Sequence, residues 1–152
     1  MRKRTRRKVW SKVNPVMHAI EGAALIPQKE LDALRLRELA TLEAFRLGRA
    51  GLQEWHDVTT FMILCEVLAE YGVGPEARPA CAALQEHLIE AARRFERTGR
   101  MGLTGPGLQA ARDVYEFHDL QRQSVARVVY ERALERLSGR IRSKAPGVTV
   151  IT

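Results

Sequence analysis

Apolar side chains recur every three or four positions through most of this 152-residue chain, and that spacing is typical of α-helices that each bury one face. Stretches rich in glycine and proline separate the helical segments. The pattern predicts a short helix over 16–24 and main helices over about 27–47, 53–71, from 75 to a glycine-rich linker at 98–107, and 108–142. We therefore expect an all-α fold: a bundle of four main helices with a long C-terminal helix and a basic N-terminal arm.

Two of these segments make specific predictions about the core. The segment 53–71 has no lysine or arginine and is apolar around most of its circumference, so it is the best candidate for a central helix. The segment 27–47 has one broad apolar face, and its charged residues, Glu38 among them, are expected mostly on other faces. That face consists of Leu31, Leu34, Leu39, Leu42 and Phe45, widened by Leu36 and Ala40.

The last helical segment contains a polar interruption. Residues 118–124 have one apolar member, Leu120, so either the helix bends there or this part leaves the core. After the helix, residues 144–152 contain Pro146-Gly147 and then a β-like run, which predicts an extended tail. The chain is thus divided into a basic arm (1–14), a helical domain (15–143) and an extended C-terminal tail (144–152).

Charge is distributed very unevenly along the chain. The formal net charge is +7, and the first twelve residues contain seven cations and no acid. The remaining residues hold 18 basic and 18 acidic side chains, with the acidic excess before residue 120 and the basic excess after it. The net positive charge therefore belongs to the arm, and the helical domain is close to neutral.

A dense cationic arm can neutralise phosphates and release counterions, which gives affinity that does not depend on base sequence. An aromatic side chain beside it can stack on a base. The arm is also compatible with a nuclear import signal, with an acidic protein surface as partner, or with a solvated terminus that aids solubility. The candidate residues for nucleic-acid binding are Arg2, Lys3, Arg4, Arg6, Arg7, Lys8, Trp10 and Lys12.

A second basic surface is predicted on the last helix. Arg132, Arg136 and Arg140 are four residues apart, so they form one ridge that could follow a phosphate backbone. The alternative is a solvent-facing ridge partly neutralised by glutamates on the same helix, such as Glu131 and Glu135.

The sequence offers little support for catalysis. The four histidines lack the three- or four-residue spacing to each other or to cysteine that a helical metal site needs, and phosphate-binding loops and nucleophile elbows are absent. Glu116, His118, Asp119 and Arg122 form a polar cluster, which we interpret as contacts between helices or as a protruding bend. We expect no enzymatic activity, no cofactor and no metal.

The N-terminal sequence lacks the apolar run of a secretory signal, and no segment has the length and hydropathy of a membrane span. A mitochondrial transit peptide would also begin rich in arginine. A cytoplasmic location is the simplest expectation, with Cys65 and Cys81 as buried thiols and no membrane partner.

Two segments carry a resemblance. The first runs from Arg2 to Trp10 and on through 14–23, and the second comprises 104–109 and 118–124. Together they resemble short uncharacterised helical proteins of bacterial phage and mobile-element regions. The resemblance implies a protein that acts by binding host or phage machinery, and it implies no activity and no site residues.

Three functions remain open at this point. The first is a nucleic-acid-associated accessory protein that binds DNA or RNA through its arm. The second is a protein-binding inhibitor or adaptor of phage or mobile-element origin. The third is self-assembly into a homo-oligomer through the long last helix and the β-like tail.

Overall fold

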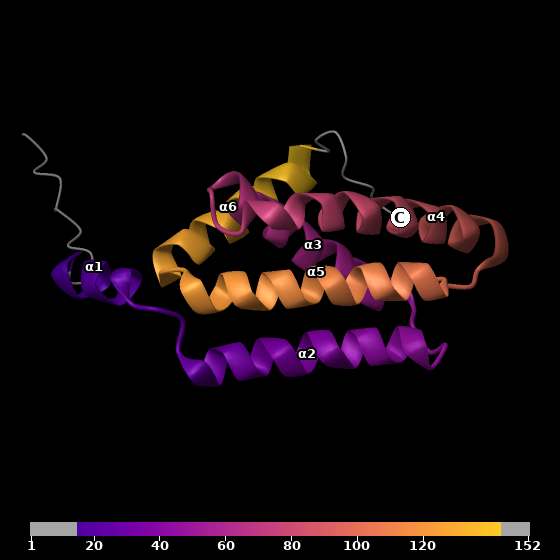
Figure 1. Ribbon diagram of the computed structural model, residues 1–152, viewed down its shortest axis with the longest axis horizontal. Helices are drawn as coiled ribbons and strands as arrows, with labels where there is room; N and C mark the ends of the chain where they lie inside the picture. Colours follow the sequence, from indigo (N-terminus) through magenta and orange to yellow (C-terminus); the bar gives the residue numbers. More distant parts are fainter. Residues whose placement is uncertain (1–14, 144–152) are drawn as a thin grey trace, which may run out of the picture.

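The computed structural model describes residues 15–143, and within that range every regular element is a helix (Figure 1). The predicted all-α class is confirmed. The arm at 1–14 and the tail at 144–152 lie outside the described residues. The elements are α1 (Pro15–Ala23), α2 (Gln28–Arg46), α3 (Leu52–Glu70), the short 3₁₀ helix η1 (Pro75–Ala77), α4 (Arg78–Thr98), α5 (Gly105–Ser124) and α6 (Arg127–Ser143).

Helix α3 is the centre of the molecule, as its apolar composition predicted. It packs against α2, α4, α5 and α6. Trp55, Val58, Cys65 and Leu68 are almost completely buried along it, and the indole Nε1 of Trp55 donates a hydrogen bond to the carbonyl of Leu88 in α4 at 3.0 Å. The indole therefore fills the core without leaving its polar atom unsatisfied.

Several helices begin or end at residues that commonly occupy helix termini. At the start of α3 the backbone N–H of Gly51 donates to the Glu54 carboxylate at 2.7 Å. At the start of α5 the Thr104 hydroxyl accepts from the backbone N–H of Gly107 at 3.1 Å, the usual role of threonine at a helix N-terminus. Helix α4 ends at Gly99, whose φ of 70° is a left-handed conformation that glycine adopts without strain.

The prediction of one long helix over 108–142 is wrong. The chain turns between α5 and α6, and Val125 is extended there with φ −101° and ψ 148°. Val125 is buried, and the hydroxyl of Ser124 donates to the carbonyls of Leu120 and Gln121 at the end of α5. No glycine or proline lies at this corner, and the polar interruption at 118–124 is the sequence feature that directly precedes it.

The predicted buried face of α2 is also corrected. Leu31, Leu42 and Phe45 are buried, but Leu39 is exposed, as is Leu36. Glu38 and Thr41 are buried in their place. The buried face keeps the helical period, but it includes a carboxylate because that carboxylate has a partner on another helix.

Helix α1 lies at one end of the molecule and packs against α6 (Figure 1). The approach is close: a Cβ added at Gly22 would lie 3.3 Å from the Cβ of Val128. An isolated antiparallel bridge pairs Leu25 with Ala126, and the N–H of Arg127 donates to the carbonyl of Ala24 at 2.9 Å. The segment after α1 is thereby tied to the corner between α5 and α6.

None of the helices within 15–143 combines the length and the hydropathy needed to cross a membrane.

Candidate functional site

The most unusual feature of the interior is a buried ion pair between α5 and α2. The guanidinium of Arg122 donates from Nη1 and Nη2 to the two carboxylate oxygens of Glu38 at 2.7 and 2.8 Å. The Arg122 side chain is 0% exposed. Parallel hydrogen bonds of this kind are the strongest geometry available to arginine and a carboxylate.

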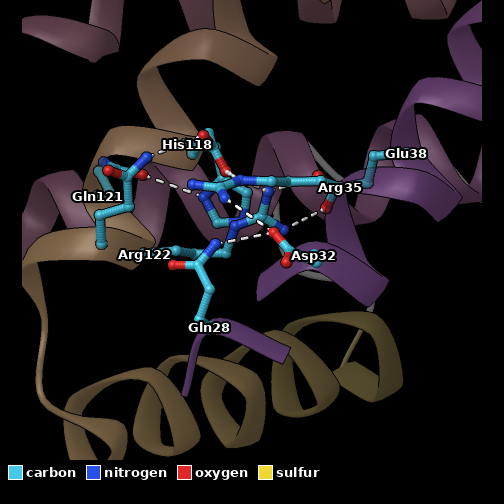
Figure 2. A network of polar contacts seen from close by, with 9 residues as sticks. Gln28, Asp32, Arg35, Glu38, His118, Gln121 and Arg122 are labelled. Carbon is cyan, nitrogen blue, oxygen red and sulfur yellow. Dashed lines mark hydrogen bonds and ion pairs between the residues drawn. The ribbon is translucent and has the colours of Figure 1, made fainter. Parts of the chain in front are cut away.

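The ion pair continues outward along the interface of the two helices (Figure 2). Asp119 accepts from Arg122 at 3.3 Å and from Arg35 of α2 at 2.8 Å. Arg35 also donates to Asp32 at 3.2 Å, and Asp32 accepts from Gln28 near the start of α2 at 2.8 Å. Acidic and basic groups therefore alternate from the buried Glu38 to the exposed start of α2.

A second branch of the network fixes the turn after α3. The ring nitrogen Nδ1 of His118 and the Oε1 of Gln121 lie 3.1 Å apart, with both side chains buried. The amide Nε2 of Gln121 donates to the carbonyls of Cys65 and Val73 at 3.0 and 2.9 Å. Helix α5 is thus connected to the end of α3 and to the loop that leads into η1.

Gly74 lies directly against this amide. Its φ is 61°, and a Cβ added there would lie 3.3 Å from the Cγ of Gln121. Glycine is therefore required both by the left-handed backbone and by the close approach of Gln121.

Burial changes the titration of these groups. Removal from water, reinforced by the nearby Arg122 charge, lowers the pKa of His118 to about 3, so its ring is neutral at physiological pH. Burial also raises the pKa of Glu38, against the hydrogen bonds and charge of Arg122 that favour the ionised form. The pKa of Asp119 is lowered: its own desolvation is outweighed by the hydrogen bond and charge of Arg35.

This arrangement holds helices together. His118 and Arg122 are completely buried, so neither presents a reactive atom at the surface. One atom of each, His118 Nε2 and Arg122 Nε, lacks a hydrogen-bond partner among the described residues. The interpretation of Glu116, His118, Asp119 and Arg122 as contacts between helices is confirmed for Asp119 and Arg122, which pair with residues of α2. The polar partner of His118 is Gln121 on the same helix, and Glu116 is exposed.

Residues 118–124 form the last part of α5, and the helix breaks at their end, at Val125, so the alternative of a bend lies close to the break in the structure. The alternative that the segment leaves the core is wrong, because His118, Gln121 and Arg122 are buried. Its single apolar residue, Leu120, is exposed, with 63% of its surface accessible, as are Gln123 and Ser124. Membership of Glu38, Arg35 and Gln121 in this network was not predicted from the sequence. A signal was present, since Glu38 lies seven residues from both Leu31 and Phe45 on the buried face of α2.

The predicted arginine ridge on α6 is largely engaged within the protein. Arg140 donates to both carboxylate oxygens of Glu70 on α3 at 2.7 and 2.8 Å. Arg136 lies 3.0 Å from the same carboxylate, and its guanidinium is 5.7 Å from the ring centre of Tyr71. Arg132 is exposed. The glutamates that neutralise the ridge come from α3, whereas the sequence suggested neighbours on α6.

The other predicted site residues, from Arg2 to Lys12, lie outside the described residues. Cys65 and Cys81 are buried free thiols, as expected. The pKa of Cys65 is raised by its interaction with Cys81 and by burial, which disfavours the reactive thiolate. Among residues 15–143, no three His, Cys, Asp or Glu side chains gather in a way that could hold a metal ion.

The chain matches no family model, no curated protein and no solved structure.

Proposed function

We propose that this protein is a non-enzymatic, nucleic-acid-associated accessory protein that contacts phosphates through its basic N-terminal arm. The division of charge along the chain carries the proposal. Residues 1–12 hold seven cations and no acid, whereas residues 15–143 hold 17 basic and 18 acidic side chains. Such an arm gains affinity by releasing the counterions of a nucleic acid, without reading its sequence.

The contacts of the folded part support this division of roles. Arg122 and Arg140 are held by carboxylates, as are Arg35 and Arg127. Arg136 lies between Glu70 and Tyr71. These arginines position helices. The cations offered to phosphate in this proposal are those of the arm, with Trp10 stacking beside them and Arg132 as an accessory contact from α6.

In this proposal α2, α3, α4 and α5 form the bundle of four main helices that carries the arm. The arm joins this body through α1, at the end of the molecule where α6 begins (Figure 1). The polar network between α2 and α5 stabilises the carrier. It takes no part in binding.

A salt titration of DNA and RNA binding tests the proposal. Each neutralised phosphate contributes about 0.9 to the slope of log affinity against log salt on duplex DNA, so full engagement of the arm gives a slope of about −6. Deletion of residues 1–12 is expected to reduce the slope to about −1 and to lower the affinity at least a hundredfold. Equal affinity and equal slope for both proteins would contradict the proposal.

Two matched variants sharpen this experiment. A protein in which the order of residues 2–12 is scrambled keeps the charge and is expected to bind like the unchanged protein. Arg132→Gln removes one exposed cation and is expected to change the slope by about one. A scrambled arm that fails to bind would show that the contact depends on the order of the side chains, against phosphate contact alone.

A second function, binding to a protein of host or phage machinery, is favoured by one observation. Ile20 and Leu25 are large apolar side chains with about 60% of their surface exposed, beside the junction of α1 and α2. Affinity capture from a nuclease-treated cell lysate separates the two functions. A partner lost with Ile20→Glu but retained after deletion of 1–12 favours protein binding, and the reverse favours the arm.

A further inference from the structure

Helix α1 presents an apolar stripe to solvent. Val16, Ala19, Ile20 and Ala23 are all exposed, and their spacing of three, four and seven residues places them on one side of the helix. Gly22, which faces Val128 of α6, lies on a different side. This spacing is that of the anchors with which a short helix enters a groove on another protein.

A surface groove that could receive such a helix begins beside α1. A hollow of about 380 Å³ is lined by Gly22, Ala24, Leu25 and Pro27 together with Arg127 and Glu131. A second hollow of about 360 Å³ shares Arg127 and Glu131 with the first and continues between α2 and α6. Its walls include Ala33, Leu34, Tyr130 and Leu134.

The groove extends further toward the centre of the molecule. A third hollow of about 180 Å³ shares Leu34, Tyr130 and Leu134 with the second and reaches Phe61 and Leu64 of α3. Leu134 keeps 38% of its surface exposed. The three hollows together form an elongated depression with mainly apolar walls. Residues of α3 lie at its far end, where Arg37, Glu38, Asp57 and Thr60 add polar groups.

The rim of the groove is mainly acidic. Glu21, Glu30 and Glu131 line its first two hollows, and the one basic residue among the lining residues there, Arg127, is paired with Glu30 at 2.7 Å. A segment that is apolar on one face and preceded by positive charges would match this rim. The chain itself contains such a segment, because the seven cations of residues 1–12 directly precede α1.

We propose that the groove binds helix α1 of a second copy of this chain, so that the protein forms a two-fold dimer. The apolar stripe and the groove lie at the same end of the molecule, because α1 residues line the start of the groove. A two-fold axis at this end places the apolar stripe of each copy on the groove of the other. Both grooves of the dimer are then occupied, so no groove is left open to a third copy. The proposal stands apart from nucleic-acid binding and requires no ligand of the arm.

The oligomeric state of the full chain, measured by light scattering after nuclease treatment over a range of concentrations, tests the dimer. The unchanged protein is expected to be dimeric. Ile20→Glu in the stripe and Leu134→Glu in the groove are each expected to weaken the dimer at least tenfold. Leu36→Glu is the matched control, because Leu36 is 72% exposed on α2 and does not line the groove, and it is expected to have no effect.

Disulfide trapping identifies the contact itself. A chain with Ile20→Cys is mixed with a chain carrying Leu134→Cys under mild oxidation by diamide, while the native cysteines remain buried. A linked pair of chains is expected from this mixture and not from Ile20→Cys mixed with Leu36→Cys. A protein that is monomeric at all concentrations overturns the proposal, as does a dimer insensitive to both glutamate substitutions. A chain that carries both Ile20→Cys and Leu134→Cys is the complementary test: a disulfide formed only within single chains overturns the proposal too, because α1 then reaches its own groove.

Discussion

Two regions of the molecule place their polar and apolar side chains in opposite ways. Where α5 meets α2, charged and polar side chains are buried, and the apolar Leu120 faces the solvent. Where α1 meets α6, Ile20 and Leu25 face the solvent beside an apolar groove. In the first region every step from Glu38 to Gln28 is a paired contact between opposite or complementary groups.

The difference teaches how to interpret a departure from the usual inside–outside pattern. A buried charge is tolerated when its partner is buried with it. The burial of the α2–α5 network is therefore explained by pairing within one copy of the chain. An exposed row of apolar side chains is typical of a surface that binds a partner. The first region therefore concerns stability, and we propose that the second concerns association.

Removing one member of the buried ion pair is expected to have the largest effect. Arg122→Met leaves the Glu38 carboxylate buried without its two donors, and the free energy of unfolding should fall by about 3–5 kcal/mol. Urea unfolding followed by circular dichroism measures the loss. The double variant Glu38→Leu/Arg122→Met should recover a large part of it. Arg132→Met, on the exposed face of α6, serves as the control and should change the free energy by no more than about 0.5 kcal/mol. A single variant as stable as this control would show that the pair contributes nothing.

Acidification tests the second branch of the network. The folded pKa of His118 is about 3, below the ordinary value of about 6.5, so between these values the unfolded chain binds a proton that the folded chain does not. Stability should therefore fall as the pH drops below about 6.5, by up to about 1.4 kcal/mol per pH unit. Below the ordinary range of Asp119 the loss of its ionised form adds to the fall, whereas the raised pKa of Glu38 acts in the opposite direction.

The window between pH 6.5 and 5 tests the histidine, and a His118 variant separates its effect from the opposite effect of the raised pKa of Glu38. Thermal or urea unfolding across this window should show a steep pH dependence for the unchanged protein and a flatter one for His118→Gln. Identical slopes for the two proteins would mean that His118 is protonated as readily in the folded chain as in the unfolded one.

The smallest effect is expected at Leu120. Its side chain lies on α5, the helix that contributes to the buried network, and is 63% exposed. Leu120→Gln should therefore change the free energy of unfolding by no more than about 0.5 kcal/mol. The same urea experiment measures it. A loss of more than about 1 kcal/mol would show that Leu120 is covered in solution, and the contrast between the two regions would then fail.

The sequence predicted those parts of the fold in which local pattern and tertiary environment agree. Helix α3 is apolar on most sides because other helices surround it, so its central position could be read from composition alone. The limits of α1, α2 and α3 were also close, because proline and glycine lie at or near their ends. In these places the residue types by themselves indicate the local structure.

The polar network could not be predicted in the same way. Glu38 and Arg122 are 84 positions apart, and each by itself looks like a residue of an exposed helix face. Only their pairing makes burial favourable, and a periodic pattern in one segment contains no information about a partner in another. The exact position of the corner at Val125 was not predicted either, because Val125 is buried in the core and α6 packs on α3, which is distant in the sequence.

The bridge between Leu25 and Ala126 has a consequence for motion. Helix α1 is attached to the body through its packing on α6 and through the hydrogen bond from Arg127 to Ala24, whereas α2–α5 are joined by the core and the buried ion pair. Local opening of α1 should therefore require far less free energy than global unfolding. The chain can release its first helix, exchange it or dock it elsewhere while the rest of the molecule keeps its structure.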